Sequence, residues 1–207
     1  MAVSLATESR VPCIDYARAY LDGLHDCLNA LDLDEVAEVI AYIEEAYDQG
    51  RQVLIIGNGG SAGTATHMAA DLAKNILPED HPDGARRLRA LSLTDNVAWI
   101  TALANDIGYE HIFSEQLKNL VQKDDLVIAI SGSGRSPNIV EGMRAARDAG
   151  AKVVALLGFD GGPARDLADA SVLVCTNRYG HIEDLHVVLI HLITSYLALC
   201  NAAAGRV

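Results

Sequence analysis

Apolar residues recur at helical spacing in the first quarter of the chain. Between residues 14 and 29 the spacing is three or four, which is typical of one face of an α-helix, and the positions are Ala17, Tyr20, Leu21, Leu24 and Leu28. A second helical segment covers 33–49, with Asp32 available as its cap and Gly50 as its end. The pattern predicts a helical N-terminal extension over residues 1–50.

From residue 51 the pattern changes to short apolar runs, each typical of a strand buried on both faces. Strands are predicted over 52–56, 89–93, 125–130, 152–157 and 171–175. Helices are predicted over 61–76, 96–104, 110–122, 137–149 and 181–203, and the polar segment 78–88 is predicted to be a loop. This alternation indicates an α/β fold, a five-stranded parallel sheet covered by helices on both faces. No linker divides the chain, so we expect one domain over 1–207 with its α/β core over 51–207.

Two loops that follow predicted strands are rich in small residues. The first contains Asn58, Gly59, Gly60 and Ser61 and leads into a helix. Glycines allow backbone amides to approach a ligand closely, and the helix N-terminus favours an anion. The loop matches neither a Walker A motif nor GxGxxG. By itself it is either an anion site or a tight turn.

The second loop holds three hydroxyls and one guanidinium, in the sequence Ser131, Gly132, Ser133, Gly134, Arg135, Ser136. Hydroxyls and backbone amides together can bind all the oxygens of one phosphate group without a metal. The alternative is a polar loop in which Ser136 only caps the next helix. In parallel sheets ligands bind beyond the carboxyl ends of the strands, so both loops mark the predicted site.

Composition narrows the classes of partner. The 207 residues carry 28 acidic and 16 basic side chains, a formal charge of −12, and only 5% are aromatic. This charge argues against a broad nucleic-acid or anionic-membrane surface, while a small anion pocket needs only a few local donors. The four cysteines match no zinc or disulfide pattern. With no secretory signal and no stretch resembling a membrane helix, we expect a cytoplasmic protein.

Histidines and carboxylates recur on the helices after the first loop and at the end of the chain. His67 and Asp71 are four apart on one helix face, and Glu183 and His191 lie within about 80° on a helical wheel. If the two pairs converge, they suit Zn²⁺ or a similar divalent ion. Alternatively these histidines, like His186, are packed or hydrogen-bonded residues without a ligand.

The two loops and their strands resemble the sugar isomerase (SIS) domain. Four longer segments sharpen this to the phosphoheptose isomerase family: GNGGSAGTATHMAADLAKN, TDNVAWITALANDIGYEHIFSEQL, SGSGRSPNIVEGMRAARDAGAKVVALLGFDGG and HIEDLHVVLIH. The resemblance covers nearly the whole chain. It implies a homotetramer with sites at subunit interfaces, and an isomerase that converts sedoheptulose 7-phosphate to D-glycero-D-manno-heptose 7-phosphate.

The resemblance also implies a ligand set and roles. One Zn²⁺ would be held by His67, Asp71, Glu183 and His191, with Asp71 or Glu183 as base and His191 as its acid–base partner. The phosphate would bind Ser61, Ser131, Ser133 and Ser136, and Asn58 and Asp95 would contact hydroxyl groups. Asp95 could instead cap the next helix.

Several positions depart from the family pattern inside this site. Asp71 stands where the family has Glu, Glu183 where it has Gln, and Gly180 where it has Asp. In the serine loop, Gly132 replaces a usual Thr and Arg135 a usual Asn. We infer that this chain retains a metal site, and that these departures allow its substrate or its mechanism to differ from those of the family. The alternatives are an isomerase of another long-chain ketose phosphate, and a non-catalytic SIS protein that binds a regulatory partner such as the replication initiator.

Overall fold

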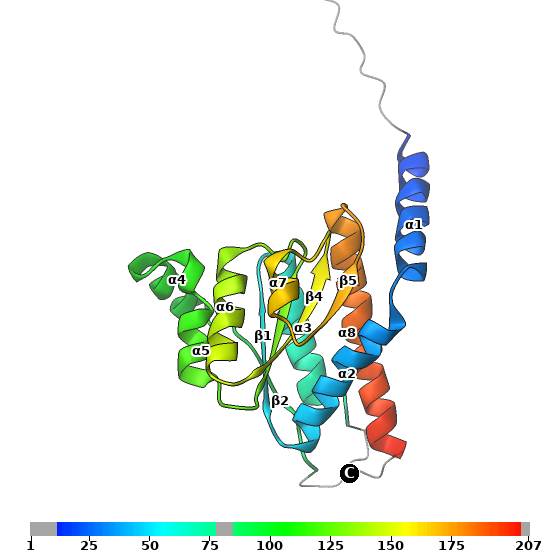
Figure 1. Ribbon diagram of the computed structural model, residues 1–207. Helices are drawn as coiled ribbons and strands as arrows, with labels where there is room; N and C mark the ends of the chain where they lie inside the picture. The colour runs from blue at the N-terminus through cyan, green and yellow to red at the C-terminus, as the bar shows by residue number, and fades with distance from the viewer. Residues whose placement is uncertain (1–11, 78–84, 204–207) are drawn as a thin grey trace, which may run out of the picture.

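The computed structural model describes residues 12–77 and 85–203 (Figure 1). Its strands are β1 Gln52–Gly57, β2 Arg89–Ser92, β3 Leu126–Ser131, β4 Lys152–Gly158 and β5 Ala170–Val174. Its helices are α1 Cys13–Asn29, α2 Leu33–Asp48, α3 Gly60–Lys74, α4 Val97–Asp106, the 3-10 turn η1 Tyr109–His111, α5 Ser114–Leu120, α6 Pro137–Asp148, α7 Gly162–Leu167 and α8 Tyr179–Ala203.

The five strands form one parallel sheet in the order β2-β1-β3-β4-β5. This confirms the predicted fold class. The chain order reverses between β1 and β3, because β2 pairs outside β1 while β4 and β5 follow β3 on the other side. Such a switch point leaves a crevice between the two loops that follow the central strands.

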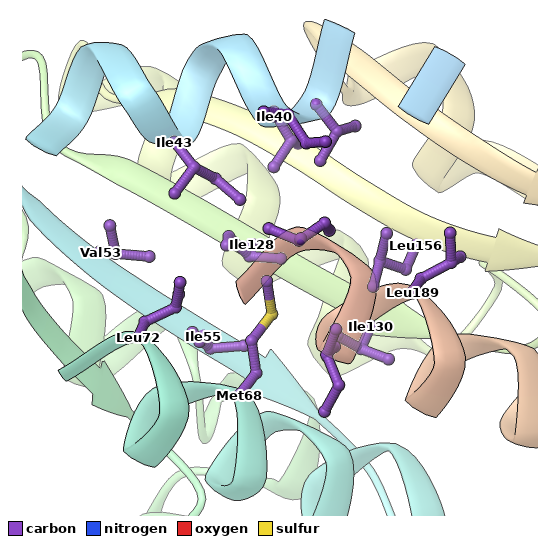
Figure 2. Packing of buried hydrophobic residues seen from close by; sticks show 14 of the residues in the cluster. Ile40, Ile43, Val53, Ile55, Met68, Leu72, Ile128, Ile130, Leu156 and Leu189 are labelled. Atoms are coloured by element: carbon purple, nitrogen blue, oxygen red, sulfur yellow. The ribbon is translucent and has the colours of Figure 1, made fainter. Parts of the chain in front are cut away.

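Alternate strand residues pack against different helical layers. Val53 and Ile55 of β1 belong to the cluster formed with α2, α3 and α8, while Leu54 and Ile56 belong to the cluster on the opposite face, with α5 and α6. Figure 2 shows the first cluster, in which Met68 of α3 points at the sheet. Burial on both faces explains why the central strands β1, β3 and β4 are apolar without alternation.

Two local features differ from the sequence prediction. The helix expected over 110–122 is divided into η1 and α5, and the short helix α7 was not predicted. Of the expected loop 78–88, residues 78–84 lie outside the described residues and 85–88 form neither helix nor strand. Asp32 caps α2 as expected, since its side chain accepts from the amides of Asp34 and Glu35.

The sequence analysis expected no stretch resembling a membrane helix. Helix α8, however, is long and apolar enough to cross a membrane, judged by length and composition alone. In the fold, however, it serves as a core helix. Leu185, Leu189 and Ile193 are fully buried, and α8 packs along α3 and over β4. The core of this domain thus accounts for part of its apolar composition, since 44% of the apolar window is buried.

Helix α1 contacts α8, and its residues Leu24 and Cys27 pack against the first core cluster. The Tyr20 hydroxyl donates to Asp184 Oδ2 at 2.5 Å, which raises the pKa of Tyr20 to about 12. The Tyr20 ring also lies edge-on to His181, at 4.4 Å between ring centroids. No residue of α1 is buried, and Figure 1 shows the helix projecting beyond the sheet.

His186 is a buried histidine that the expected chemistry does not use. Its Nε2 lies 3.2 Å from the Leu157 carbonyl oxygen, and Nδ1 has no partner in the described structure. Burial lowers the pKa of His186 from 6.5 to about 4. Between these pH values the unfolded chain binds a proton that the folded chain does not, so the free energy of unfolding decreases as the pH falls.

We therefore predict a pH-dependent stability that depends on His186. At pH 5 the difference between the two pKa values is worth about 2 kcal/mol. Replacing His186 with Gln keeps a donor for the Leu157 carbonyl and removes the titration. The loss of stability between pH 7 and pH 5, measured by urea unfolding, should be smaller by about this amount in His186→Gln. Exposed His25 provides the control substitution, and parallel pH curves for the His186 variant and the unaltered chain would contradict the prediction.

Candidate active site

The pairing of β1 with β3 brings the two predicted loops together. Gly57 is aligned with Ile130, so Asn58 and Ser131 begin their loops side by side. Each loop leads into the N-terminus of a helix, α3 or α6, on opposite faces of the sheet. The described structure therefore confirms that both loops lie at the carboxyl edge of neighbouring strands.

The first loop turns tightly so that a carboxylate can approach its backbone. Gly59 is the N-cap of α3 and has a positive φ of 57°, a conformation that glycine adopts readily. A Cβ on Gly60 would lie 2.7 Å from both carboxylate oxygens of Glu183. Glu183 thus lies directly against the first turn of α3, where the helix dipole stabilises negative charge.

The second loop is held by its own side chains. Ser131 Oγ accepts from the Gly134 amide at 3.1 Å, and Ser133 Oγ from the Arg135 amide at 3.3 Å. Ser136 is the N-cap of α6 but makes no side-chain capping bond within the described chain. The alternative reading, in which Ser136 serves only as a helix cap, therefore lacks the bond that would define it.

These loops enclose a small polar cavity of about 120 Å³, which we call the serine pocket. It is lined by Asn58, Ser61, Ile130, Ser131, Gly132, Ser133, Ser136, Tyr179 and Glu183. Several hydroxyls and the N-termini of two helices face one space, which suits a tetrahedral oxyanion. The Glu183 carboxylate is the one acidic side chain among these lining residues, and it opposes an anion.

Asn58 is fixed by residues from two other elements. Asn58 Nδ2 donates to Asn138 Oδ1, and Asn138 Nδ2 donates back to Asn58 Oδ1, both at 2.8 Å. The Tyr109 hydroxyl also donates to Asn58 Oδ1 at 3.1 Å. This network sets the orientation of the Asn58 amide at the edge of the serine pocket.

Three of the four expected metal ligands meet on the outer side of α3 and α8. His67 Nε2 lies 3.3 Å from His191 Nε2 and 3.4 Å from Asp71 Oδ2, and His191 Nε2 lies 3.9 Å from the same oxygen. Asn75 donates to the other Asp71 oxygen at 2.8 Å. The two imidazoles are about half exposed, 46% and 52%, and the Asp71 side chain is 14% exposed.

These separations fit a tetrahedral zinc ion. With metal–ligand distances of 2.0–2.1 Å, two donors of a tetrahedral ion lie about 3.3–3.5 Å apart. The measured donor separations are 3.3, 3.4 and 3.9 Å, so the three atoms could form one face of such a tetrahedron. Two imidazoles and one carboxylate, with a fourth position open, form a donor set used by catalytic zinc sites.

Glu183 does not join this cluster within one chain, in contrast to the expected set of four ligands. Gly60 contacts Glu183, and His67 contacts His191, so α3 and α8 run in the same direction. Eight residues of helix separate Glu183 from His191, an axial rise of about 12 Å. A helical wheel gives only the angle between these side chains and ignores the rise along the helix axis.

Asp95 lies at the end of β2 and is tied to α3. Its Oδ1 accepts from the Thr66 hydroxyl at 2.5 Å, one residue before His67. The helix that follows is capped by Asn96, whose side chain accepts from the Trp99 amide. Asp95 is therefore not the cap, and its expected contact with substrate stays a prediction.

Sequence reasoning missed three residues that shape the site. Asn138 and Tyr109 orient Asn58, and Tyr179 lines the serine pocket. They come from η1, α6 and α8, and none belongs to a glycine-rich or metal-ligand pattern. Only the position of Asn138, two residues after the serine loop, could have drawn attention to it.

Comparison with known proteins agrees with this geometry. The family model described as the SIS domain matches residues 15–158. The chain is similar to a probable phosphoheptose isomerase of Thermoplasma acidophilum, with 34% identity over 87% of this chain and 97% of that protein. It is also similar to a phosphoheptose isomerase of Helicobacter pylori, with 37% identity over 84% of this chain and 88% of that protein.

A solved structure extends the likeness to the fold. The phosphoheptose isomerase from Francisella tularensis matches with a TM-score of 0.83 and 28% identity, covering 91% of this chain and all of that one. The sequence segments, the sheet order and the two loops thus agree with the same relatives. The chain belongs to the phosphoheptose isomerase family of SIS-domain proteins.

Proposed function

We propose that this protein is an aldose–ketose isomerase that converts sedoheptulose 7-phosphate to D-glycero-D-manno-heptose 7-phosphate. The observation that carries the proposal is the spacing of two sites along α3 and α8. The serine pocket lies at the start of both helices, and His67, Asp71 and His191 lie further along them. The helical rise from Ser61 to His67 is about 9 Å, and from Glu183 to His191 about 12 Å.

This spacing matches an open-chain heptose phosphate. Six carbon–carbon bonds in an extended chain, followed by the phosphate ester, separate C1 from phosphorus by about 10 Å. A phosphate in the serine pocket would therefore allow C1 and C2 to reach His67, Asp71 and His191. The hydroxyls of Ser61, Ser131, Ser133 and Ser136 and the N-terminal amides of α3 and α6 would hold the phosphate.

Isomerisation moves a proton between C1 and C2 and needs a base and an acid. Asp71 is the carboxylate in position for this, because Glu183 lies at the other end of the site. Its Oδ1 is held by Asn75 while Oδ2 faces the two imidazoles. We propose Asp71 and His191 as the pair that removes the carbon proton and protonates the carbonyl oxygen.

We further propose that His67 Nε2, His191 Nε2 and Asp71 Oδ2 hold a divalent ion such as Zn²⁺, which would leave Asp71 Oδ1 and His191 Nδ1 for proton transfer. The donor separations and the donor types support this. When bound, such an ion polarises the carbonyl and hydroxyl oxygens at C1 and C2. Two roles do not depend on the ion. The serine pocket would anchor the phosphate, and the α3–α8 pair would set the distance from the phosphate to the reacting carbons.

Substitutions at the proton-transfer pair should remove turnover without unfolding the protein. Both side chains are partly exposed, so their substitution should leave the fold intact. Because Asp71→Asn and His191→Gln each remove a proton-transfer group, they should lower kcat by about 10²–10⁴-fold. The assay is NMR detection of the aldose phosphate, with solvent deuterium at C2. His25→Gln, on an exposed turn of α1, is the matched control. If the folded, metal-loaded protein gives neither product nor label, the proposal is contradicted. A panel of C6 to C8 ketose phosphates would then be tested.

Metal content gives a test that does not depend on turnover. After dialysis against Zn²⁺-containing and then metal-free buffer, elemental analysis should find about one ion per chain. His67→Ala and His191→Ala should each lose most of it, because two donors hold a divalent ion far more weakly than three. His25→Ala should keep it. Equal metal content in all four proteins would contradict the assignment.

We also propose a homotetramer that acts in the cytoplasm. Its support is the apolar surface that one chain leaves uncovered: Ile14 and Leu21 of α1 are 73% and 61% exposed. A second stripe follows α8 beside His191, and consists of Val188, Leu192, Tyr196 and Leu199. Surfaces of this kind mark contacts between proteins. All four cysteines are free, as is usual in a reducing compartment.

The assembly predicts a measurable mass. Light scattering after size exclusion should give four times the mass of one chain. Leu21→Asp and Leu192→Asp should each shift the population to smaller species, because a buried unpaired carboxylate is costly at an interface. Asn119→Asp introduces the same charge on an exposed turn of α5 and should leave the mass unchanged. A monomeric unaltered chain would contradict the tetramer.

A further inference from the structure

The ring of Tyr179 lies against the serine loop at Gly132, which has no side chain. A Cβ on Gly132 would be 3.0 Å from Tyr179 Cε1 and 3.1 Å from Cδ1. Gly132 has no positive φ, so the backbone conformation does not call for glycine here. The absence of a side chain at position 132 leaves the space that the Tyr179 ring uses.

The Tyr179 ring also packs against the ring of Phe159. Their ring centroids are 4.9 Å apart in an edge-on arrangement. Phe159 has a φ of 53°, a left-handed conformation that is unfavourable for a bulky residue and that concentrates at functional sites. The loop carrying Phe159 is tied to the serine loop, since the Gly158 amide donates to the Gly132 carbonyl at 2.9 Å.

Tyr179 stands between two cavities. It lines the serine pocket, and with Ser133 it also lines a larger neighbouring cavity of about 450 Å³. The remaining residues of that cavity are Arg135, Phe159, Asp160 and Asn177. Because Tyr179 precedes Glu183 by one helical turn, it closes the end of the serine pocket that lies away from His191.

We propose that Tyr179 is a phosphate-binding residue of the serine pocket, held in place by Phe159 and admitted by Gly132. Its hydroxyl adds a donor to those of the serine loop, and its ring closes the far end of the pocket. This inference rests on the proposed function in one respect, because it takes the bound phosphate to be that of the sugar phosphate substrate. The ligand class, a phosphate monoester or inorganic phosphate, follows from the lining of the pocket.

Electrostatics gives this additional donor a role. Glu183 places a carboxylate in the same pocket, where it repels a phosphate dianion. Arg135 lies on the loop, but its guanidinium is bound to Asp160 at 2.5 Å. Both Arg135 and the Gly162 amide hold the pKa of Asp160 below its usual range, the amide more strongly. With Arg135 paired in this way, Tyr179 would supply a neutral donor from the first turn of α8.

The test measures binding of inorganic phosphate by calorimetry and, separately, KM and kcat for sedoheptulose 7-phosphate. Tyr179→Phe removes only the hydroxyl and should weaken phosphate binding about tenfold, the usual effect of losing a hydrogen bond to a charged group. KM should rise in parallel while kcat changes little. Tyr16→Phe, on the exposed face of α1, is the matched control, and Ser133→Ala is the positive control.

A double-substitution cycle tests the part played by Gly132. Gly132→Ala should weaken phosphate binding when Tyr179 is present, because the new methyl group displaces the ring. In the Tyr179→Ala background the same substitution should have no further effect. An equal loss in both backgrounds would mean that the methyl group acts on phosphate directly, and would overturn the role given to Gly132.

The two proposals can fail separately. Tyr179→Phe that binds phosphate as tightly as the unaltered chain overturns the role of Tyr179, whether or not the protein isomerises the sugar. Phosphate binding that depends on Tyr179 without any turnover supports this inference and counts against the proposed reaction.

Discussion

The hydrogen-bonded pairing of β1 with β3 is the constraint on which the site depends. It joins two strands that are separated by about seventy residues of sequence and aligns Gly57 with Ile130. The loops after these strands can form one pocket only because the strands are neighbours. The helices that follow leave on opposite faces of the sheet, so their N-termini converge on that pocket from two sides. A phosphate bound there would meet two helix dipoles as well as the serine hydroxyls.

The second constraint is the parallel contact of α3 with α8. Parallel helices keep a fixed spacing, so contacts at Gly60–Glu183 and His67–His191 set two levels about 10–12 Å apart. The buried faces of both helices, with Met68 and Leu189, are fixed against the same sheet face (Figure 2). The distance between the serine pocket and the cluster of His67, Asp71 and His191 is therefore determined by the core.

The sequence predicted most of this architecture because its signals are local. A buried strand, a glycine-rich turn and a helix are neighbours in the chain, so Ser61 and Ser131 could be assigned to the same edge of the sheet. The 3-10 turn and α7 were missed because each is one to two turns long and carries Gly, Pro or polar residues. The sequence also predicted a long apolar helix at the position of α8, but it did not show that this helix packs in the core.

Long-range geometry limited the prediction of the site. A helical wheel reports angles but not axial rise, so Glu183 was grouped with His191 although two turns of helix separate them. Tyr179 and Tyr109 reach the site from elements whose positions relative to the loops only the folded chain reveals. The altered residues can be understood together on this basis. Glu183 brings negative charge into the serine pocket, while Gly132 leaves space for the Tyr179 ring. Under the proposal, an unfavourable carboxylate and an additional donor would face the same anion. Under the proposal, phosphate binding in so acidic a protein would depend on oriented neutral donors and helix termini, and would not require net positive charge.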